Sequence, residues 1–402
     1  MKIIEQTARA SYGKLLAILV KITDGDIALA EDCLSAAFAK ALETWAESKV
    51  PENPEAWLVT TAKNQLLDGL RHKQVKATNE ADLIDHLIES QTTSTTFDYR
   101  LELLFVCSHP AIDSNIRTAL MLQTVMGFKV SEIAPLFLLS PLTLEKRLTR
   151  AKQKIKLAQI PFAKPDISEM PGRISEVLEV IYGVFGRSWD LLNEPLEEEA
   201  LFLARLVTEL LPNEPEPKGL LSLLLFCRSR QRARRLDSVY VPLDEQDTRL
   251  WDNELIAEAE NLLKQAFLIN KHGRFQYEAA LQSAQLAKIL NNADTDRDVI
   301  ALYEKLQALT NAVGVSVSFA AALLRMSRIE QAHSILADLE KTESVAIRSY
   351  QPYWVLMAEM SLKLKENDSA KKYLQTALGL TEDLTVKSFL LNKMKNIERT
   401  RP

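Results

Sequence analysis

The chain's strongest chemical signal is a cluster of positive charge in residues 140–156, which read SPLTLEKRLTRAKQKIK. Residues 140–160 hold six Lys or Arg and one Glu, whereas the whole chain has a formal net charge of -5. Such cations can pair with phosphate oxygens and with the acceptor edge of guanine, but they are also common on a solvated helix face. A helical wheel gathers most of them on one face, together with a hydroxyl: Thr143, Lys146, Arg147, Arg150 and Lys154.

The element that must carry these side chains is predicted to be a helix with a second, apolar face. Ser140 can cap its first turn, and Pro141 suits the first helical position because its missing N–H costs nothing there. Just before it, residues 127–140 (GFKVSEIAPLFLLS) predict a turn glycine, a short helix and a tight break. A short helix, a turn and a basic second helix form a helix-turn-helix pattern, which favours DNA contact over a solvated face. The wheel places the apolar residues of the second helix together: Leu144, Leu148, Ala151 and Ile155.

Composition predicts an all-α protein. The 402 residues include only 11 Gly, and most segments are rich in Ala, Leu, Glu, Lys and Gln, which favours helices over sheets. The chain is 47% hydrophobic and 26% charged, an ordinary globular balance, and its length predicts about two to four domains. Three scattered cysteines indicate a reducing compartment, and no apolar run is long enough to span a membrane. We therefore expect a soluble, cytoplasmic protein without membrane attachment.

Breaks in the helical pattern predict five parts along the chain. The first part should contain a helix from Asp26 to Trp45 and a second that starts at Asn53-Pro54 and runs to about Lys73. The five parts are a helical block over 1–75, a polar linker over 76–97, a second helical block over 98–160, a helical middle domain over 161–290 and a C-terminal domain over 291–402.

The C-terminal domain shows a weak internal repeat. Ala320 and Ala332 are twelve residues apart, as are Ala358 and Ala370, and a shift of 38 residues superposes the two pairs. Small residues at this spacing let two antiparallel helices pack closely, which is the basis of the tetratricopeptide pattern. Since about three copies are usually needed, a generic helical hairpin explains the spacing equally well.

In this order, the segments resemble bacterial RNA polymerase sigma factors of the extracytoplasmic-function type, and most closely the subgroup with a tetratricopeptide-like C-terminal extension. DIALAEDCLSAAFAKALETW (26–45) and NPEAWLVTTAKNQLLDGLRHK (53–73) are similar to the family's region 2. GFKVSEIAPLFLLSPLTLEKRLTRAKQKIK (127–156) is similar to region 4, and VPLDEQDTRLWD (241–252) is typical of the extension. The chain departs from the family at Ser35-Ala36-Ala37, where Gln-Glu-Ala is common.

The resemblance implies a role for each region. The first helix would present Glu31, Asp32 and Ser35 to core RNA polymerase, although an acidic pair is more often simply solvated. The basic helix would enter the major groove at the −35 element, with its cations on base edges or phosphates. The helix over 53–73 would hold the opened −10 element through Asn53, Trp57, Lys63, Asn64, Arg71 and Lys73, although a Trp at a helix start is more often in the core.

We therefore predict a sigma factor that binds core RNA polymerase and promoter DNA and directs promoter-specific transcription initiation. The extension is predicted to regulate activity through a protein or small-molecule regulator, and we expect no cofactor and no enzymatic chemistry. The sequence contains no GxxxxGK[ST], GxGxxG, HExxH or GxSxG. The main alternative is a helical-repeat interaction scaffold with a degenerate DNA-binding half.

Two further clusters have structural explanations. Cys107-Ser108-His109 lacks a second ligand pair at metal spacing, so we expect no metal site. The arginines of CRSRQRARR (227–235) could bind nucleic acid, but acidic segments lie nearby in the sequence and favour internal ion pairs.

Overall fold

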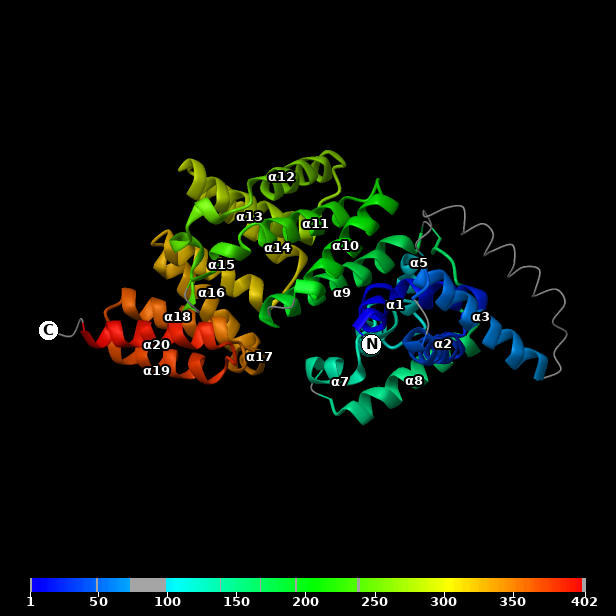
Figure 1. The fold of residues 1–402 in the computed structure, drawn as a ribbon. Coiled ribbons are helices and arrows are strands. Elements are labelled where there is room, and N and C mark those ends of the chain that lie inside the picture. Colours follow the sequence, from blue (N-terminus) through cyan, green and yellow to red (C-terminus); the bar gives the residue numbers. More distant parts are fainter. Residues whose placement is uncertain are drawn as a thin grey trace. The chain divides into compact units, whose positions relative to one another are not determined.

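The computed structural model describes residues 2–47, 50–72, 99–137, 139–166, 168–191, 194–236 and 239–399. Most of them lie in helices, and the only strands among them are two short segments that pair as an antiparallel hairpin. The predicted all-α fold class is therefore confirmed. The chain divides into two compact units, Met1–Val184 and Phe185–Pro402, whose helices are drawn in Figure 1. The finer five-part division stays a prediction.

The first unit begins with three mutually packed helices, α1 (Lys2–Ile22), α2 (Ile27–Glu47) and α3 (Pro54–His72). Each turns an apolar stripe inward, because Leu and Ala recur at spacings of three and four residues. Their shared core contains side chains with no exposed surface, including Leu15, Leu34 and Leu58.

Side-chain caps start two of these helices, as the sequence predicts. Asp26 Oδ1 accepts the backbone N–H of Leu29 at 3.2 Å, and Asn53 Oδ1 accepts that of Ala56 at 3.0 Å. Each cap satisfies one of the N–H groups that the first helical turn leaves without a partner.

The rest of the first unit is built from shorter helices. The last of them, α8, begins as predicted: Ser140 accepts the N–H of Thr143 at 3.2 Å, and Pro141 is the first helical residue. These elements are α5 (Arg100–Cys107), α6 (Ser114–Thr124), α7 (Val130–Ile133), the 3-10 helix η1 (Ala134–Phe137) and α8 (Pro141–Leu157).

Helix α9 (Met170–Leu191) begins in the first unit and ends in the second. A buried side chain holds its start: Arg173 donates to the carbonyl oxygen of Phe105 at 2.5 Å and to Ser108 Oγ at 3.2 Å. A guanidinium group is favourable there because the last carbonyls of α5 have no partner within the helix.

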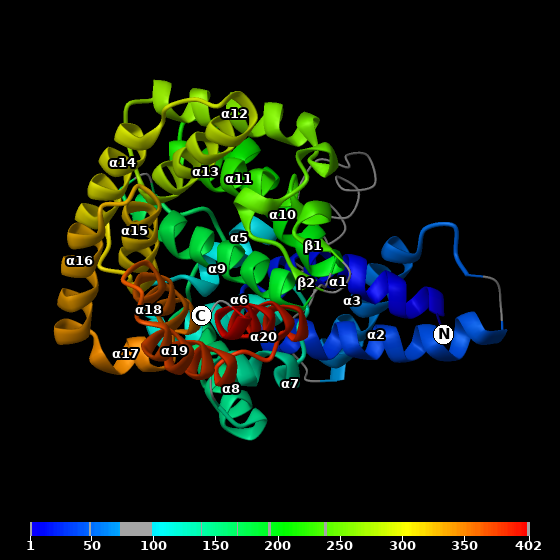
Figure 2. The same ribbon diagram turned by 90° about the vertical axis from the view of Figure 1, so that its left-hand side faces the viewer.

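The second unit continues with helices and one hairpin. Figure 2 labels these helices and the two strands of the hairpin in a second view. Its elements are α10 (Glu194–Leu210), α11 (Pro215–Arg228), η2 (Gln231–Ala233), β1 (Arg235–Leu236), β2 (Val239–Tyr240), η3 (Leu243–Glu245), η4 (Thr248–Leu250), α12 (Asn253–Leu268), α13 (Arg274–Asn291), α14 (Asp296–Leu309), α15 (Val313–Arg325), α16 (Ile329–Thr342), α17 (Ser344–Arg348), α18 (Gln351–Lys363), α19 (Asn367–Gly379) and α20 (Leu384–Arg399).

The repeated alanines lie where close helix packing needs small side chains. Helix α15 packs on α16 and α18 packs on α19. Ala320 and Ala332 have no exposed surface in the first pair, and neither do Ala358 and Ala370 in the second. The spacing of twelve therefore brings small residues of consecutive helices into the core.

The hairpin ties the last helix to the middle of the second unit. Arg235 Nη2 lies 2.9 Å from Asp383 Oδ2, which precedes α20. The ring of Tyr240 packs edge-on against that of Phe389 with centroids 5.7 Å apart. Segments about 150 residues apart in sequence are thus joined within one unit.

In the part of the chain that the structure describes, no helix combines the length and the apolar character that crossing a membrane requires.

Candidate nucleic-acid interface

Helix α8 has the two faces that the wheel predicts. Leu144 and Ile155 are 0% and 1% exposed, and Leu148 and Ala151 are buried beside them. The five predicted contact residues all have exposed side chains: Thr143, Lys146, Arg147, Arg150 and Lys154. The apolar face fixes α8 against the unit, and the opposite side offers long cations to a partner.

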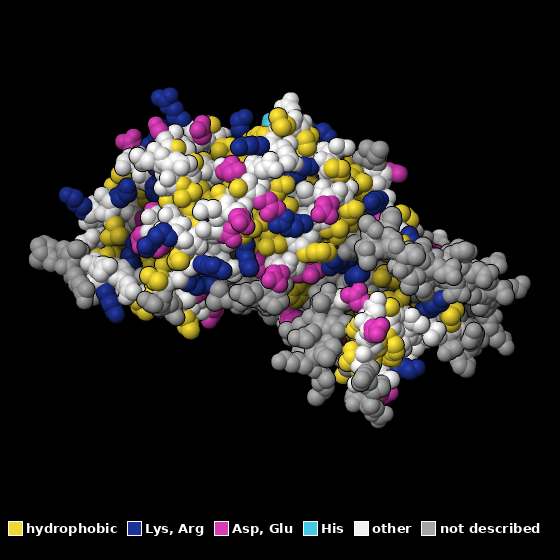
Figure 3. All heavy atoms as spheres, turned by 45° about the horizontal axis from the view of Figure 1, so that its top comes forward, with side chains coloured by type: hydrophobic (Ala, Val, Ile, Leu, Met, Phe, Trp, Pro, Cys, Tyr) yellow, Lys and Arg dark blue, Asp and Glu magenta, His cyan; other side chains and the backbone are white. Residues whose placement is uncertain are grey.

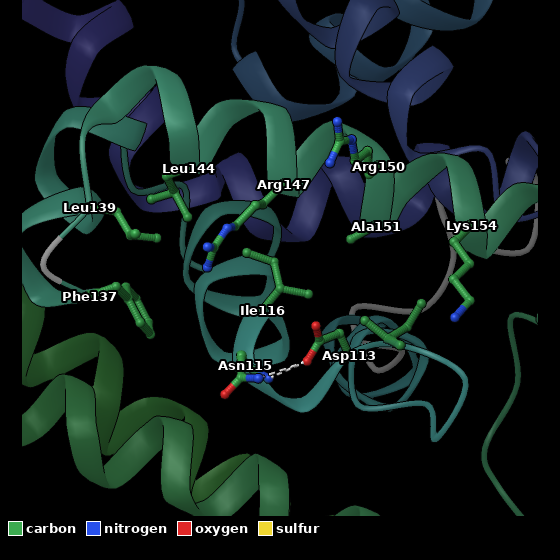
Figure 4. A pocket seen from close by; sticks show the side chains of 11 residues that line it. Asp113, Asn115, Ile116, Phe137, Leu139, Leu144, Arg147, Arg150, Ala151 and Lys154 are labelled. Atoms are coloured by element: carbon green, nitrogen blue, oxygen red, sulfur yellow. Dashed lines mark hydrogen bonds between the residues drawn. The ribbon is translucent and has the colours of Figure 1, made fainter.

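A hollow of about 610 Å³ lies beside this face. Its floor is apolar, with Ile116 from α6 and Phe137 from η1, and its charged lining includes Arg147, Arg150 and Lys154. In Figure 4, Arg147 and Lys154 extend from α8 toward α6, whereas Arg150 points away from it. An anionic partner at this surface would meet cations next to apolar side chains.

Asp113, the acidic residue that lines the hollow, stabilises the start of a helix. Asp113 caps α6, and its Oδ1 accepts the backbone N–H of Asn115 at 3.0 Å and the side-chain amide at 3.1 Å. Its charge is therefore directed to the helix N-terminus, where it is favourable.

Helix α3 presents an exposed polar edge. Asn53 and Asn64 of the predicted −10 set are exposed, and Thr60 lies exposed between them. Thr60 was not among the predicted contacts, although its spacing of seven residues from Asn53, about two helical turns, would have placed it on the same edge.

The other predicted residues of α3 lie differently. Trp57 is half-buried and packs edge-on against Trp45, with ring centroids 5.4 Å apart. Lys63 is only 8% exposed, so its ammonium group is not on the open edge. The side chain of Arg71 and the whole of Lys73 lie outside the described residues.

On α2, the three predicted polymerase contacts separate into two environments. Asp32 and Ser35 are exposed, but Glu31 is held by α8: both of its carboxylate oxygens accept hydrogen bonds from Lys152 Nζ at 2.6 Å. The side chains of Glu31 and Lys152 are 20% and 9% exposed. Burial raises the pKa of the Glu31 carboxyl, and Lys152 opposes that rise.

A second ion pair joins the same two helices. Lys156 Nζ lies 2.5 Å from Asp26 Oδ2. The Lys156 side chain is 63% exposed, so this pair is screened by solvent and contributes little stability. Both lysines lie off the cationic face of α8, since the helical period places them on its remaining side.

The cysteine and histidine of Cys107-Ser108-His109 serve local structure. The thiol of Cys107 lies 3.4 Å from Thr124 Oγ1, and burial raises the pKa of that thiol to about 12. His109 Nδ1 accepts the backbone N–H of Ala111 at 3.1 Å.

Three of the five arginines in 227–235 make internal polar contacts, in line with the favoured interpretation. Arg228 pairs with Glu197 at 3.0 Å, Arg230 donates to Gln282 at 2.5 Å and Arg235 pairs with Asp383. Among the described side chains on the face drawn in Figure 3, Lys and Arg are interspersed with Asp and Glu. This face therefore offers no support for a second nucleic-acid site.

Residues 8–75, which contain most of α1 and all of α2 and α3, match the sigma-70 region 2 family. The chain therefore contains a sigma-70 region 2 domain. This domain indicates a role in transcription initiation and implies binding to core RNA polymerase and promoter DNA.

A curated relative matches most of the chain. The uncharacterized protein R00370 of Rhizobium meliloti (strain 1021) is 34% identical over an alignment of 327 residues, and the match covers 77% of each chain. Residues 173–267 match DUF6596, a family of unknown function. No solved structure matches the chain. Helices α5 to α8 fall outside both matched families, so the role of the cationic face is argued from its geometry.

Proposed function

We propose that this protein is a sigma factor of the extracytoplasmic-function type that directs promoter-specific transcription initiation. The observation that carries the proposal is α8, which buries one apolar face and exposes a row of cations, directly after a short helix and next to a region 2 domain. In this proposal α7, η1 and α8 form the helix-turn-helix of region 4.

The exposed face of α8 would read the −35 element. Arg147 and Arg150 carry planar forks that match guanine O6 and N7, so we assign them to base edges. Lys146 and Lys154 are point charges suited to phosphates, and Thr143 at the start of the helix adds a hydroxyl. The hollow beside α8 leaves room for Arg147 to extend without burying its charge.

The exposed edge of α3 would hold the opened −10 element. Asn53, Thr60 and Asn64 offer hydrogen-bonding groups along it, and the half-buried Trp57 offers a ring edge supported by Trp45. Opened DNA needs such surfaces because its unstacked bases must be held individually. The buried Lys63 is assigned to supporting the helix rather than to contact.

The extension would regulate this activity. Paired helices with buried alanines, as in α15 with α16 and α18 with α19, support a tetratricopeptide-like domain, and such domains bind partners on their helical faces. A protein or small-molecule regulator is the proposed partner.

Co-elution with core RNA polymerase tests the proposal against that of an interaction scaffold. The wild-type protein is expected to co-elute with the core enzyme in gel filtration. Asp32→Lys should weaken this binding about tenfold, because it reverses a charge on the exposed face of α2. Glu304→Lys, the same reversal at an exposed position on α14, is the matched control. Failure of the wild-type protein to bind core polymerase would contradict the proposal.

A further inference from the structure

The hollow beside α8 has the size and the apolar lining of a small-molecule site. Its volume of about 610 Å³ falls within the range of ligand pockets, roughly 300–1,000 Å³. The apolar lining comes from α6 and the turn before it, from η1 and the turn after it, and from α8: Ile112, Ile116, Phe137, Leu139, Leu144 and Ala151. A ligand in the hollow could therefore remove an apolar body from water.

Two cations of α8 reach over this apolar lining. Arg147 lies four residues before Ala151 and Lys154 lies three residues after it, so the helical period places both at the edge of the buried face. Both side chains extend from α8 toward α6 (Figure 4). They are seven residues apart, which is about 10.5 Å along the helix axis. A ligand in the hollow could place an anionic group beside either cation.

Within the described chain, no carboxylate neutralises these two cations. The ion pairs that α8 makes there use Lys152 and Lys156, which bind Glu31 and Asp26. Asp113 is the only acidic residue in the described lining, and its Oδ1 is engaged by the N-terminus of α6. The hollow thus combines apolar side chains with an excess of positive charge, and a ligand that complements both has an apolar body and an anionic group.

We propose that the hollow binds a free small molecule with an apolar chain and a terminal carboxylate, and that this ligand competes with promoter DNA for Arg147. The guanidinium group of Arg147 can hold a carboxylate through two parallel hydrogen bonds, and the ammonium group of Lys154 adds a point charge. The competition rests on the proposed function, in which Arg147 contacts a base edge. An arginine that pairs with the ligand cannot pair with guanine at the same time, so the ligand inhibits promoter recognition.

Octanoate is a probe that has both features of the proposed ligand. Isothermal titration calorimetry of the full-length protein with octanoate should show one site per chain. Octanamide keeps the chain without the charge, and butyrate keeps the charge with a shorter chain, so each should bind at least about tenfold more weakly. An absence of octanoate binding, or equal affinity for octanoate and octanamide, would overturn the proposal.

Two variants test whether octanoate binds in the hollow. Arg147→Gln and Lys154→Gln should each weaken octanoate binding about tenfold, because the carboxylate loses a charged partner. Both side chains are exposed, so the variants should fold, and either one alone keeps the test decisive if the other misfolds. Wild-type octanoate affinity in both variants would place the ligand elsewhere and contradict the proposal.

Lys146→Gln is the matched control for these two variants. It removes the same charge from an exposed position on α8 that does not line the hollow. It should keep the wild-type affinity for octanoate, although it removes a proposed phosphate contact. A loss as large as that in Arg147→Gln would show that octanoate responds only to the total charge of α8, against a site in the hollow.

Fluorescence anisotropy of the polymerase complex on labelled promoter DNA measures the competition. Octanoate at ten times its Kd should weaken promoter binding about tenfold by mass action, whereas butyrate at the same concentration should leave it unchanged. Unchanged promoter affinity with octanoate bound would overturn the competition. Absence of promoter binding without octanoate would instead contradict the proposed function, and calorimetry would still decide whether the hollow binds the ligand.

Discussion

At the scale of single residues, the positively charged side chains of α8 lie in two different environments, which depend on their position around the helix. Arg147 and Arg150 have exposed side chains, whereas Lys152 is 8% exposed and is held by Glu31. The difference follows from the helical period, since residues two apart lie about 200° around the axis from one another. One side of the helix is therefore left open for the proposed DNA contact, while another side fixes the helix on α2.

Replacing either exposed arginine should weaken promoter recognition. We expect Arg147→Ala and Arg150→Ala each to cost about 1–3 kcal/mol in binding of the polymerase complex to its promoter, because each removes a bidentate base contact. The variants should fold normally, since both side chains are exposed. Fluorescence anisotropy on labelled promoter DNA measures the change.

Thr149→Ala is the control for these variants, because Thr149 is exposed on α8 but lies toward the side of Lys156 and off the cationic face. Its promoter affinity should equal that of the wild-type protein. If both arginine variants bind promoter DNA with wild-type affinity, the assignment of α8 to promoter recognition is wrong.

Local signals in the sequence predicted much of the site, and they did so for physical reasons. The caps at Asp26, Asn53 and Ser140 and the buried face of α8 depend only on neighbours within a turn or two of helix. The pairing of Lys152 with Glu31 could not be predicted in the same way, because its partners lie 121 residues apart and meet only through tertiary packing. The burial of Lys63 has the same origin.

At the scale of elements, Asp383 joins α20 to the β1–β2 hairpin through its ion pair with Arg235. Partial burial raises the pKa of the Asp383 carboxyl, but hydrogen bonds from Thr385 and the pair with Arg235 lower it by more, so the net shift is downward. A carboxyl with a lowered pKa in the folded state stabilises the fold above its unfolded pKa, about 3.9, and this contribution is lost as the pH falls toward the lowered value.

Asp383→Asn should therefore remove an acid-sensitive contribution to the second unit. We expect a loss of about 1 kcal/mol at pH 7, since one hydrogen-bonded charged pair is weakened by partial exposure to solvent. The loss should shrink as the pH falls below about 4, where the carboxyl becomes protonated first in the unfolded chain and then, at lower pH, in the folded wild-type protein. Urea unfolding followed by circular dichroism at several pH values measures both effects.

The neighbouring Glu382→Gln serves as the control, because Glu382 is exposed. It should leave the free energy of unfolding unchanged at every pH. An Asp383→Asn loss that does not depend on pH would show that the tie contributes through packing and not through charge.

At the scale of the whole molecule, the chain joins a sigma-70 region 2 over 8–75 to a helical extension that contains the DUF6596 match over 173–267. Helix α9 crosses from the first compact unit into the second, and Arg173 fixes its start to the end of α5. The all-α class could be predicted from composition because Gly is scarce and helix formers dominate. The hairpin that ties α20 to the second unit could not, since its two-residue strands carry no periodic signal.

In vitro transcription tests the central claim most directly. The purified protein would be added to core RNA polymerase on a library of genomic fragments, and the transcripts would be sequenced from their 5′ ends. We predict discrete start sites that appear only when the protein is present and that share one −35 and one −10 sequence. Start sites no different from those of core polymerase alone would contradict the account.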